Sequence, residues 1–522
     1  MKKITTLLLS FIIVVAVSAQ NRYLVYLTDK GNNQAIDIAD VLSPRAIKNH
    51  QKNNVVFNES DFPVNPVYIE KLNEIGQVLK KSKWLNAVVL TSNKTAYELA
   101  QLPFVKEVEA LSTSVITKNN KFKEELQLDK TLNYDSTANQ NIQIGVDCIH
   151  DKGYLGDNVL LAVLDGGFQG MDTILAFDSL YLQNRVVDKF NFIDNDTTVY
   201  ERSSHGTMVA SVIAGNQTGF IGSAPNVSLC LYITEDVAVE VHEEEFDLVR
   251  GLERADSVGA DLVNISLSYF QFDTLQGDYV YADMDGKTTI CAKGVQVATS
   301  KGLLVVCSAG NSGPDYIRSP CDADSILCVG ATDTNSVKAG FSSVGPSADQ
   351  RVKPDVSAVG KRAFVVDNDG DIRTANGTSF SSPLTCGMVA CLMQAHPTHT
   401  MLEIINSVKE SSDQYGSPDS LLGYGIPNAC KADSILNFIA LNIDEGISVD
   451  DNFSMYPNPS NGYVTISADH QITLVEVFSL EGRLVKTVKT KGNSVLINLS
   501  NLSKGTYLVK VNNTSYSRLI KY

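Results

Sequence analysis

The stretch VLLAVLDGG, residues 159–167, decides the fold of the central part of the chain. An unbroken apolar run of this length is typical of a strand that is buried on both faces of a parallel sheet. Asp165 ends the run, and the two glycines after it allow a sharp turn. Since α/β proteins place their active groups at the carboxyl ends of such strands, Asp165 is a candidate functional residue.

More apolar runs alternate with helical patterns between residues 140 and 435. Strand-like runs occupy 228–233, 260–267, 302–310 and 325–331, and helical stretches occupy 206–215, 244–259 and 293–302. Buried strands that alternate with helices predict an α/β fold, in which helices cover both faces of a parallel sheet.

The flanking regions follow other patterns. Residues 21–112 predict a small α+β, ferredoxin-like module with strands at 22–28, 84–92 and 105–111 and helices at 66–79 and 94–102. A polar linker is expected at 117–141. Beyond residue 452, short alternating strands separated by turn signals predict an all-β sandwich.

The first residues, MKKITTLLLSFIIVVAVSAQ, have the pattern of a signal peptide that is cut after Ala19. We therefore expect export, with no transmembrane helix in the mature chain, because no later segment has the apolar length to span a bilayer. The net charge of −16 argues against general binding to nucleic acid or to anionic membranes.

The chain has nine cysteines, so at least one stays unpaired within the chain. Cys307, Cys386 and Cys391 lie in apolar runs, where cysteine usually behaves as a small buried hydrophobic residue. Cys321 and Cys328 flank a short polar loop and are candidates for a disulfide. We expect no cysteine nucleophile, since none stands beside an obvious base.

Two further stretches carry candidate chemistry. His205 stands at the start of an apolar helix in SSHGTMVASVIAG, and Ser379 stands just before a long apolar helix in NGTSFSSPLTCGMVACLM. The nearby Ser381 and Ser382 suit capping of that helix before Pro383. Each residue alone is a weak signal, but the order Asp, His, Ser matches one convergent arrangement of a nucleophilic triad.

In these blocks the sequence resembles the subtilases, the subtilisin-like serine peptidases. The matching segments are VLLAVLDGGF, HGTMVASVIAG, LVVCSAGNSG and NGTSFSSP. The resemblance implies an endopeptidase with Ser379 as nucleophile, His205 as base and Asp165 as the group that orients the base. It also implies that Asn311 donates to the oxyanion, with the Ser379 amide as second donor.

The resemblance also implies where the substrate binds. One wall of the primary specificity pocket would be formed by Ser266, Leu267 and Ser268. The opposite wall would be formed by Ser308, Ala309 and Gly310. Family members often carry glycine where Ser268 stands, so the size of the pocket stays open. Small residues along its walls fit a medium or large apolar side chain.

Two acidic clusters, DMDG at 283–286 and DNDGD at 367–371, have the composition of calcium loops. Each lies between strand-like runs, where aspartate and glycine form tight turns, and we favour that reading. Subtilases often bind structural calcium, but no ligand set can be assigned here. Catalysis by the triad requires no cofactor or metal.

The flanks resemble known accessory domains. SPRAIKNHQKNN and SKWLNAVVLTS are similar to subtilase prosegments, which implies an intramolecular inhibitor removed by autoprocessing within 113–135. YPNPSNGYVTI, VEVFSLEGRLVKT and LSKGTYLVKV resemble the C-terminal sorting domain of type IX secretion, which implies that machinery as a partner and a secreted or surface-attached product.

The expected organisation has five parts. They are a signal peptide (1–19), a prosegment with its linker (20–130), a peptidase domain (131–437), a second linker (438–452) and a sorting domain (453–522). Four alternatives stay open. The N-terminal module could be permanent, the tail could be an adhesion or sugar-binding sandwich, and the central domain could be a scaffold without activity or an enzyme for another acyl transfer.

Overall fold

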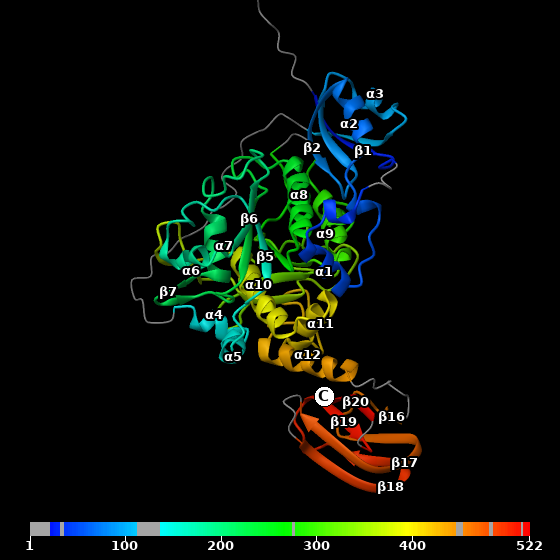
Figure 1. Cartoon of the computed structure of the whole chain (residues 1–522). Coiled ribbons are helices and arrows are strands. Elements are labelled where there is room, and N and C mark those ends of the chain that lie inside the picture. The colour runs from blue at the N-terminus through cyan, green and yellow to red at the C-terminus, as the bar shows by residue number, and fades with distance from the viewer. Residues whose placement is uncertain are drawn as a thin grey trace, which may run out of the picture.

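A computed structural model describes residues 21–31, 36–111, 136–273, 277–444, 453–479, 484–512 and 515–521 (Figure 1). The predicted signal peptide, most of the predicted first linker and part of the second lie outside the described residues. Three bodies follow one another along the chain, and the largest lies in the middle.

The middle body is built on a seven-stranded parallel sheet with the order β13-β12-β11-β10-β5-β9-β6. The strands are β5 (Leu160–Asp165), β6 (Val186–Asn191), β9 (Ser228–Ile233), β10 (Leu262–Ile265), β11 (Leu304–Ser308), β12 (Leu327–Thr332) and β13 (Val356–Val359). The predicted parallel sheet is confirmed. The two edge strands, β6 and β13, were not predicted, and β6 breaks the apolar pattern with the charged residues Asp188 and Lys189.

Helices cover both faces of this sheet. Alternate residues of β5 point to opposite faces, so Leu161 and Val163 pack in one core and Leu160, Ala162 and Leu164 in the other. The first core includes residues of α7 (His205–Ala214), α10 (Thr378–Ala395), α11 (Met401–Ser411) and α12 (Ala429–Asp444). The second includes residues of α8 (His242–Val258) and α9 (Ile290–Ser300).

Short elements complete this body. They are the helices α4 (Ala138–Gln143), α5 (Val146–Asp151) and α6 (Asp178–Leu182), the hairpins β7 (Asn216–Gln217) with β8 (Phe220–Ile221) and β14 (Ala363–Val366) with β15 (Ile372–Ala375), and the 3-10 turns Leu175–Phe177 and Tyr281–Asp283. Among the described residues, no helix combines the length and the hydropathy needed to span a bilayer.

The N-terminal body has a four-stranded antiparallel sheet with the order β2-β3-β1-β4. Its elements are β1 (Asn21–Leu27), α1 (Pro44–Lys52), α2 (Pro66–Asn73), β2 (Gly76–Ser82), β3 (Ala87–Ser92), α3 (Ala96–Ala100) and β4 (Val105–Leu111), with 3-10 turns at Ile38–Asp40 and Glu59–Asp61.

The α+β class of this body is confirmed, but the helix predicted at 66–79 was wrong beyond Asn73. The chain turns there and enters β2, which pairs with β3. Gly76 permits this pairing, because a Cβ at that position would lie 2.2 Å from the carbonyl oxygen of Thr91. Helix α1 was also not predicted.

The N-terminal body packs on α8 and α9 (Figure 1). Tyr26 and Trp84 join the same hydrophobic core as these helices. The carboxylate of Asp61 forms a buried ion pair with Lys301 at 2.7 Å, directly after α9. Ser82 donates a 2.5 Å hydrogen bond to Glu253 of α8. The two bodies therefore share an apolar core that is flanked by buried polar contacts.

The C-terminal body is an antiparallel β structure, as predicted, with β16 (Phe453–Tyr456), β17 (Tyr463–Ser479), β18 (Leu484–Asn498), β19 (Gly505–Val511) and β20 (Ser515–Lys521). The sequence pattern predicts short strands, but β17 and β18 are each a long strand that spans two of these short runs. The register between β17 and β18 shifts between Ser467 and Ile472, so each long strand passes through an irregularity and does not end there.

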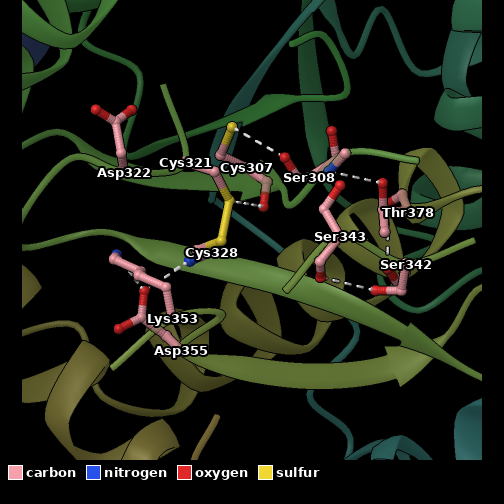
Figure 2. The surroundings of a disulfide bond; sticks show 12 residues. Cys307, Ser308, Cys321, Asp322, Cys328, Ser342, Ser343, Lys353, Asp355 and Thr378 are labelled. Atoms are coloured by element: carbon pink, nitrogen blue, oxygen red, sulfur yellow. Dashed lines mark hydrogen bonds and ion pairs between the residues drawn. A yellow bond between two sulfur atoms is a disulfide. The ribbon is translucent and has the colours of Figure 1, made fainter. Parts of the chain in front are cut away.

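Two disulfides hold the middle body. The predicted pair Cys321–Cys328 is present, and Figure 2 shows it with Cys307 close by. A second disulfide, Cys148–Cys430, joins α5 to α12 and was not predicted, since its cysteines lie 282 residues apart. The other five cysteines are free and buried. Burial raises the pKa of the Cys307, Cys386 and Cys391 thiols, which agrees with the expectation of no cysteine nucleophile.

We expect the double change Cys148→Ser and Cys430→Ser to lower the free energy of unfolding by about 2–5 kcal/mol, because this disulfide constrains a long segment of the unfolded chain. The matched control, Cys321→Ser with Cys328→Ser, opens a segment with a separation of only 7 residues and should cost less. Chemical denaturation of both variants measures the difference. A larger loss of stability on removing Cys321–Cys328 than on removing Cys148–Cys430 would contradict this prediction.

Candidate active site

Asp165 and His205 meet at the carboxyl end of β5. The Nδ1 atom of His205 lies 2.8 Å from Oδ1 and 2.9 Å from Oδ2 of Asp165, and both side chains are buried. Asp165 Oδ1 also accepts the N–H of Gly166 at 2.7 Å. Because a carboxylate only accepts, the proton of a neutral imidazole stays on Nδ1, and Nε2 keeps its lone pair.

This meeting depends on a close approach of α7 to β5. The N–H of Gly206 donates to the carbonyl of Gly167 at 3.0 Å. A Cβ on Gly206 would lie 2.4 Å from that carbonyl oxygen and 3.0 Å from Cβ of Asp165. Glycine at the second position of α7 therefore sets the distance between the helix and the aspartate.

Ser379 lies in the first turn of α10, and Ser266 contacts it. Pro383 lies inside the helix and has no N–H to donate to the carbonyl four residues earlier, which belongs to Ser379. That carbonyl accepts the Ser266 hydroxyl at 3.0 Å instead. The Ser379 hydroxyl donates to the Ser266 carbonyl at 3.5 Å. The ring of Phe380 lies 6.1 Å from the His205 ring, so the start of α10 and the start of α7 face each other.

The capping roles predicted for Ser381 and Ser382 were wrong. Helix α10 begins at Thr378, ahead of both residues. The Ser381 hydroxyl donates to the Thr378 carbonyl at 3.1 Å, and the Ser382 hydroxyl donates to Oδ1 of Asn264 at 2.8 Å. Both side chains are buried within the helix packing, and neither caps its end.

Asn311 is held by Thr378, a residue that the sequence did not single out. Asn311 Oδ1 accepts the backbone N–H of Thr378 at 2.8 Å and its hydroxyl at 2.9 Å. These bonds assign the oxygen of the amide and turn its nitrogen toward the neighbouring Gly377. Within the described part of the chain, no hydrogen bond occupies Asn311 Nδ2. The sequence feature that could have pointed to Thr378 is a hydroxyl side chain directly before Ser379.

The two predicted pocket walls continue neighbouring parallel strands. Residues 266–268 follow β10 and residues 308–310 end or follow β11, and the strands pair with Ile265 opposite Cys307. The two hydrogen bonds between Ser266 and Ser379 place the first wall beside α10. The Gly310 N–H donates to the Thr378 hydroxyl at 3.2 Å, which places the second wall at the same helix start.

The acidic clusters form turns. Asp367 lies between β14 and β15, and Oδ1 accepts two backbone N–H groups of its own hairpin turn at 3.0 Å each. In 283–286, Asp285 accepts the backbone N–H groups of Lys287 and Thr288. The prediction that the cluster at 283–286 lies between strands was wrong, because it begins at the last residue of a 3-10 turn and precedes α9.

A third group of carboxylates gathers at the start of α8. Oxygens of Glu235, Glu240 and Glu244 lie within 4.8 Å of one another. Glu235 accepts the Tyr269 hydroxyl at 2.9 Å, and Glu244 accepts the Val241 N–H at 2.9 Å. These bonds hold the loop before α8, and we assign no cation to it.

Comparisons with known proteins give the family of the chain. The sequence profile of the subtilase family matches residues 156–425, which is more than half of the chain. The chain belongs to the subtilase family. It is 29% identical over 279 residues to subtilisin DY of Bacillus licheniformis, covering 52% of this chain and 90% of that protein. It is 26% identical over 345 residues to an alkaline protease of Alkalihalobacillus alcalophilus, covering 64% and 82%.

A solved structure, MycP1 from Mycobacterium smegmatis, is 22% identical with a TM-score of 0.48, and the match covers 61% of this chain and 89% of that one. The flanking bodies match as well. Residues 22–127 match a peptidase S8 propeptide domain of Bacteroidota, and residues 454–521 match a secretion system C-terminal sorting domain.

This subtilase is therefore a serine-type endopeptidase with a propeptide. Its sorting domain indicates secretion or attachment to the cell surface.

We expect Gly206→Ala to reduce peptidase activity by about 10²-fold, since the added Cβ would push α7 away from β5 and misplace His205 by a fraction of an ångström or more. The matched control is Gly416→Ala, because a Cβ there meets no atom within 4 Å. Turnover of a peptide substrate, with circular dichroism to monitor folding, compares the two. Full activity in the Gly206 variant would refute the role of the close approach.

Proposed function

We propose that Ser379 is the nucleophile of the endopeptidase, with His205 as its base and Asp165 as the group that orients the base. Ser379 Oγ attacks the scissile carbonyl while His205 Nε2 takes its proton. The C–N bond then breaks as the imidazolium returns a proton to the leaving amine. Water then attacks the acyl-enzyme while His205 takes its proton, and the Ser379 oxygen leaves as it regains a proton from the imidazolium.

One observation carries this proposal. The buried His205–Asp165 pair lies at the carboxyl end of β5 and faces the start of α10, which carries Ser379 in its first turn. The carboxylate fixes the tautomer and stabilises the imidazolium that forms during the reaction. These groups suffice for acyl transfer, so the mechanism needs no cofactor, and structural calcium is not assigned to any residues.

We infer that Asn311 Nδ2 and the backbone N–H of Ser379 form the oxyanion hole. The oxygen of the Asn311 amide is anchored on Thr378, which leaves its donor atom beside Gly377 and next to the nucleophile. Donors held in place before the reaction stabilise the charge that develops on the substrate oxygen.

For the substrate, the proposal assigns an extended peptide to the edge of residues 266–268 and the side chain before the cut to the space between the two walls. The walls are Ser266, Leu267 and Ser268 on one side and Ser308, Ala309 and Gly310 on the other. Ser266 has a second role in this scheme, since its hydroxyl holds the carbonyl of Ser379.

We propose the domain boundaries expected from the sequence: signal peptide 1–19, prosegment and linker 20–130, peptidase 131–437, linker 438–452 and sorting domain 453–522. The three profile matches, at residues 22–127, 156–425 and 454–521, fall within the proposed prosegment with its linker, the peptidase and the sorting domain. We propose that the prosegment inhibits the enzyme until Ser379 cleaves the chain within 113–135. The type IX machinery would then recognise the sorting domain.

We predict that Ser379→Ala abolishes hydrolysis and leaves the prosegment attached, because the attacking hydroxyl is lost. Ser381→Ala is the matched control two residues away, and it should keep substantial activity since that hydroxyl donates to the Thr378 carbonyl of α10 itself. Intact mass and N-terminal sequencing report the processing, and a peptide assay reports hydrolysis. Equal effects of the two changes would overturn the assignment of Ser379.

A second prediction concerns Asn311→Ala. The protein should fold normally yet lose about 10²–10³ in turnover, a magnitude measured in a member of this same family. Asn311→Asp is a useful companion, because it keeps the acceptor for Thr378 but removes the donor. Normal kcat in the alanine variant would exclude Asn311 from the oxyanion hole.

A further inference from the structure

The segment around Arg318 joins the two walls of the proposed specificity pocket. The Arg318 N–H donates to the Ala309 carbonyl of one wall at 3.1 Å. The Tyr269 N–H, directly after the other wall, donates to the Ser319 carbonyl at 2.8 Å. Residues 318–319 therefore bridge the two walls, and a side chain at 318 belongs to the pocket or its rim.

The Arg318 side chain spans the gap between the walls. Its Cγ would lie 2.7 Å from a Cβ on Gly310, so only glycine lets the stem lie so close to this wall. Its Nε donates to the Ser312 hydroxyl at 2.8 Å. The guanidinium carbon lies 4.4 Å from the centroid of the Phe270 ring, which follows the other wall. Packing on an aromatic face and one hydrogen bond hold the guanidinium in a defined place.

The charge of this guanidinium is not matched by an ion pair. Among the described residues, no carboxylate lies within ion-pair distance of Arg318. Asp315 and Glu240 act on it from farther away, and burial lowers its pKa from the usual value. Arginine stays protonated at neutral pH even so. A half-buried cation that has no carboxylate partner among the described residues gains most from a ligand that brings a carboxylate.

We propose that Arg318 determines specificity by binding the carboxylate of an acidic side chain in the substrate residue that precedes the scissile bond. The inference rests on the proposed function, because it uses the same pocket and the same nucleophile. The terminal nitrogens of Arg318 offer two parallel N–H donors, a geometry that fits a carboxylate. This differs from the apolar preference expected from the small residues of the walls alone.

The test compares peptides that differ only at the residue before the cut, which is Glu, Gln, Leu or Lys. Glu and Gln have the same shape, so their ratio isolates the charge. For the processed wild-type enzyme we expect kcat/KM for Glu to exceed that for Gln by about tenfold or more. Arg318→Gln should bring the ratio near one, and Arg318→Glu should favour Lys.

The matched control is Arg254→Gln, which removes an arginine of α8 that pairs with Asp188 and should keep the Glu preference. The inference fails if wild-type enzyme shows no preference for Glu over Gln, or if the preference survives Arg318→Gln. The wild-type ratio decides even if a variant does not fold. If no peptide is cleaved, the proposed function fails together with this inference. If peptides are cleaved without a preference for Glu, only this inference fails.

Discussion

The buried contact between Asp165 and His205 is the constraint on which the rest of the active site depends. It places a carboxylate at the end of a strand that is central to the sheet and an imidazole at the start of a helix on one face. A buried carboxylate is costly unless it is hydrogen-bonded, and here His205 and the Gly166 N–H supply the bonds. The glycine after His205 follows from this contact, because any side chain there would separate the pair.

A second chain of contacts joins the proposed nucleophile to the proposed substrate edge. Pro383 withholds the helical hydrogen bond that the Ser379 carbonyl would otherwise accept, and Ser266 takes its place. Thr378 joins the same helix start to Asn311 on one side and to Gly310 on the other. The start of α10 thus sets the position of three proposed functions together: attack, oxyanion binding and recognition of the substrate side chain.

The sequence predicted the parallel sheet, because apolar runs and helix starts are local patterns, and the contact between Asp165 and His205 fits the expected triad. Contacts between residues far apart in the sequence could not be predicted from such local patterns. Nothing near Cys148 indicates Cys430, and nothing near Arg318 shows that it bridges two walls that belong to other strands. Strand β2 was missed for the same reason, since its residues have helical spacing and only pairing with β3 makes them a strand. Ser382 looked like a cap because its partner, Asn264, lies in another element.

The most direct test of the central claim is to label the folded, processed enzyme with a fluorophosphonate and map the adduct by mass spectrometry. A serine attacks the phosphorus and displaces fluoride only if a base activates it. The account predicts one adduct, on Ser379. This adduct should not form when the enzyme is heat-denatured before labelling, nor in a His205→Ala variant. An adduct on another serine, or labelling of Ser379 that persists without His205, would contradict it.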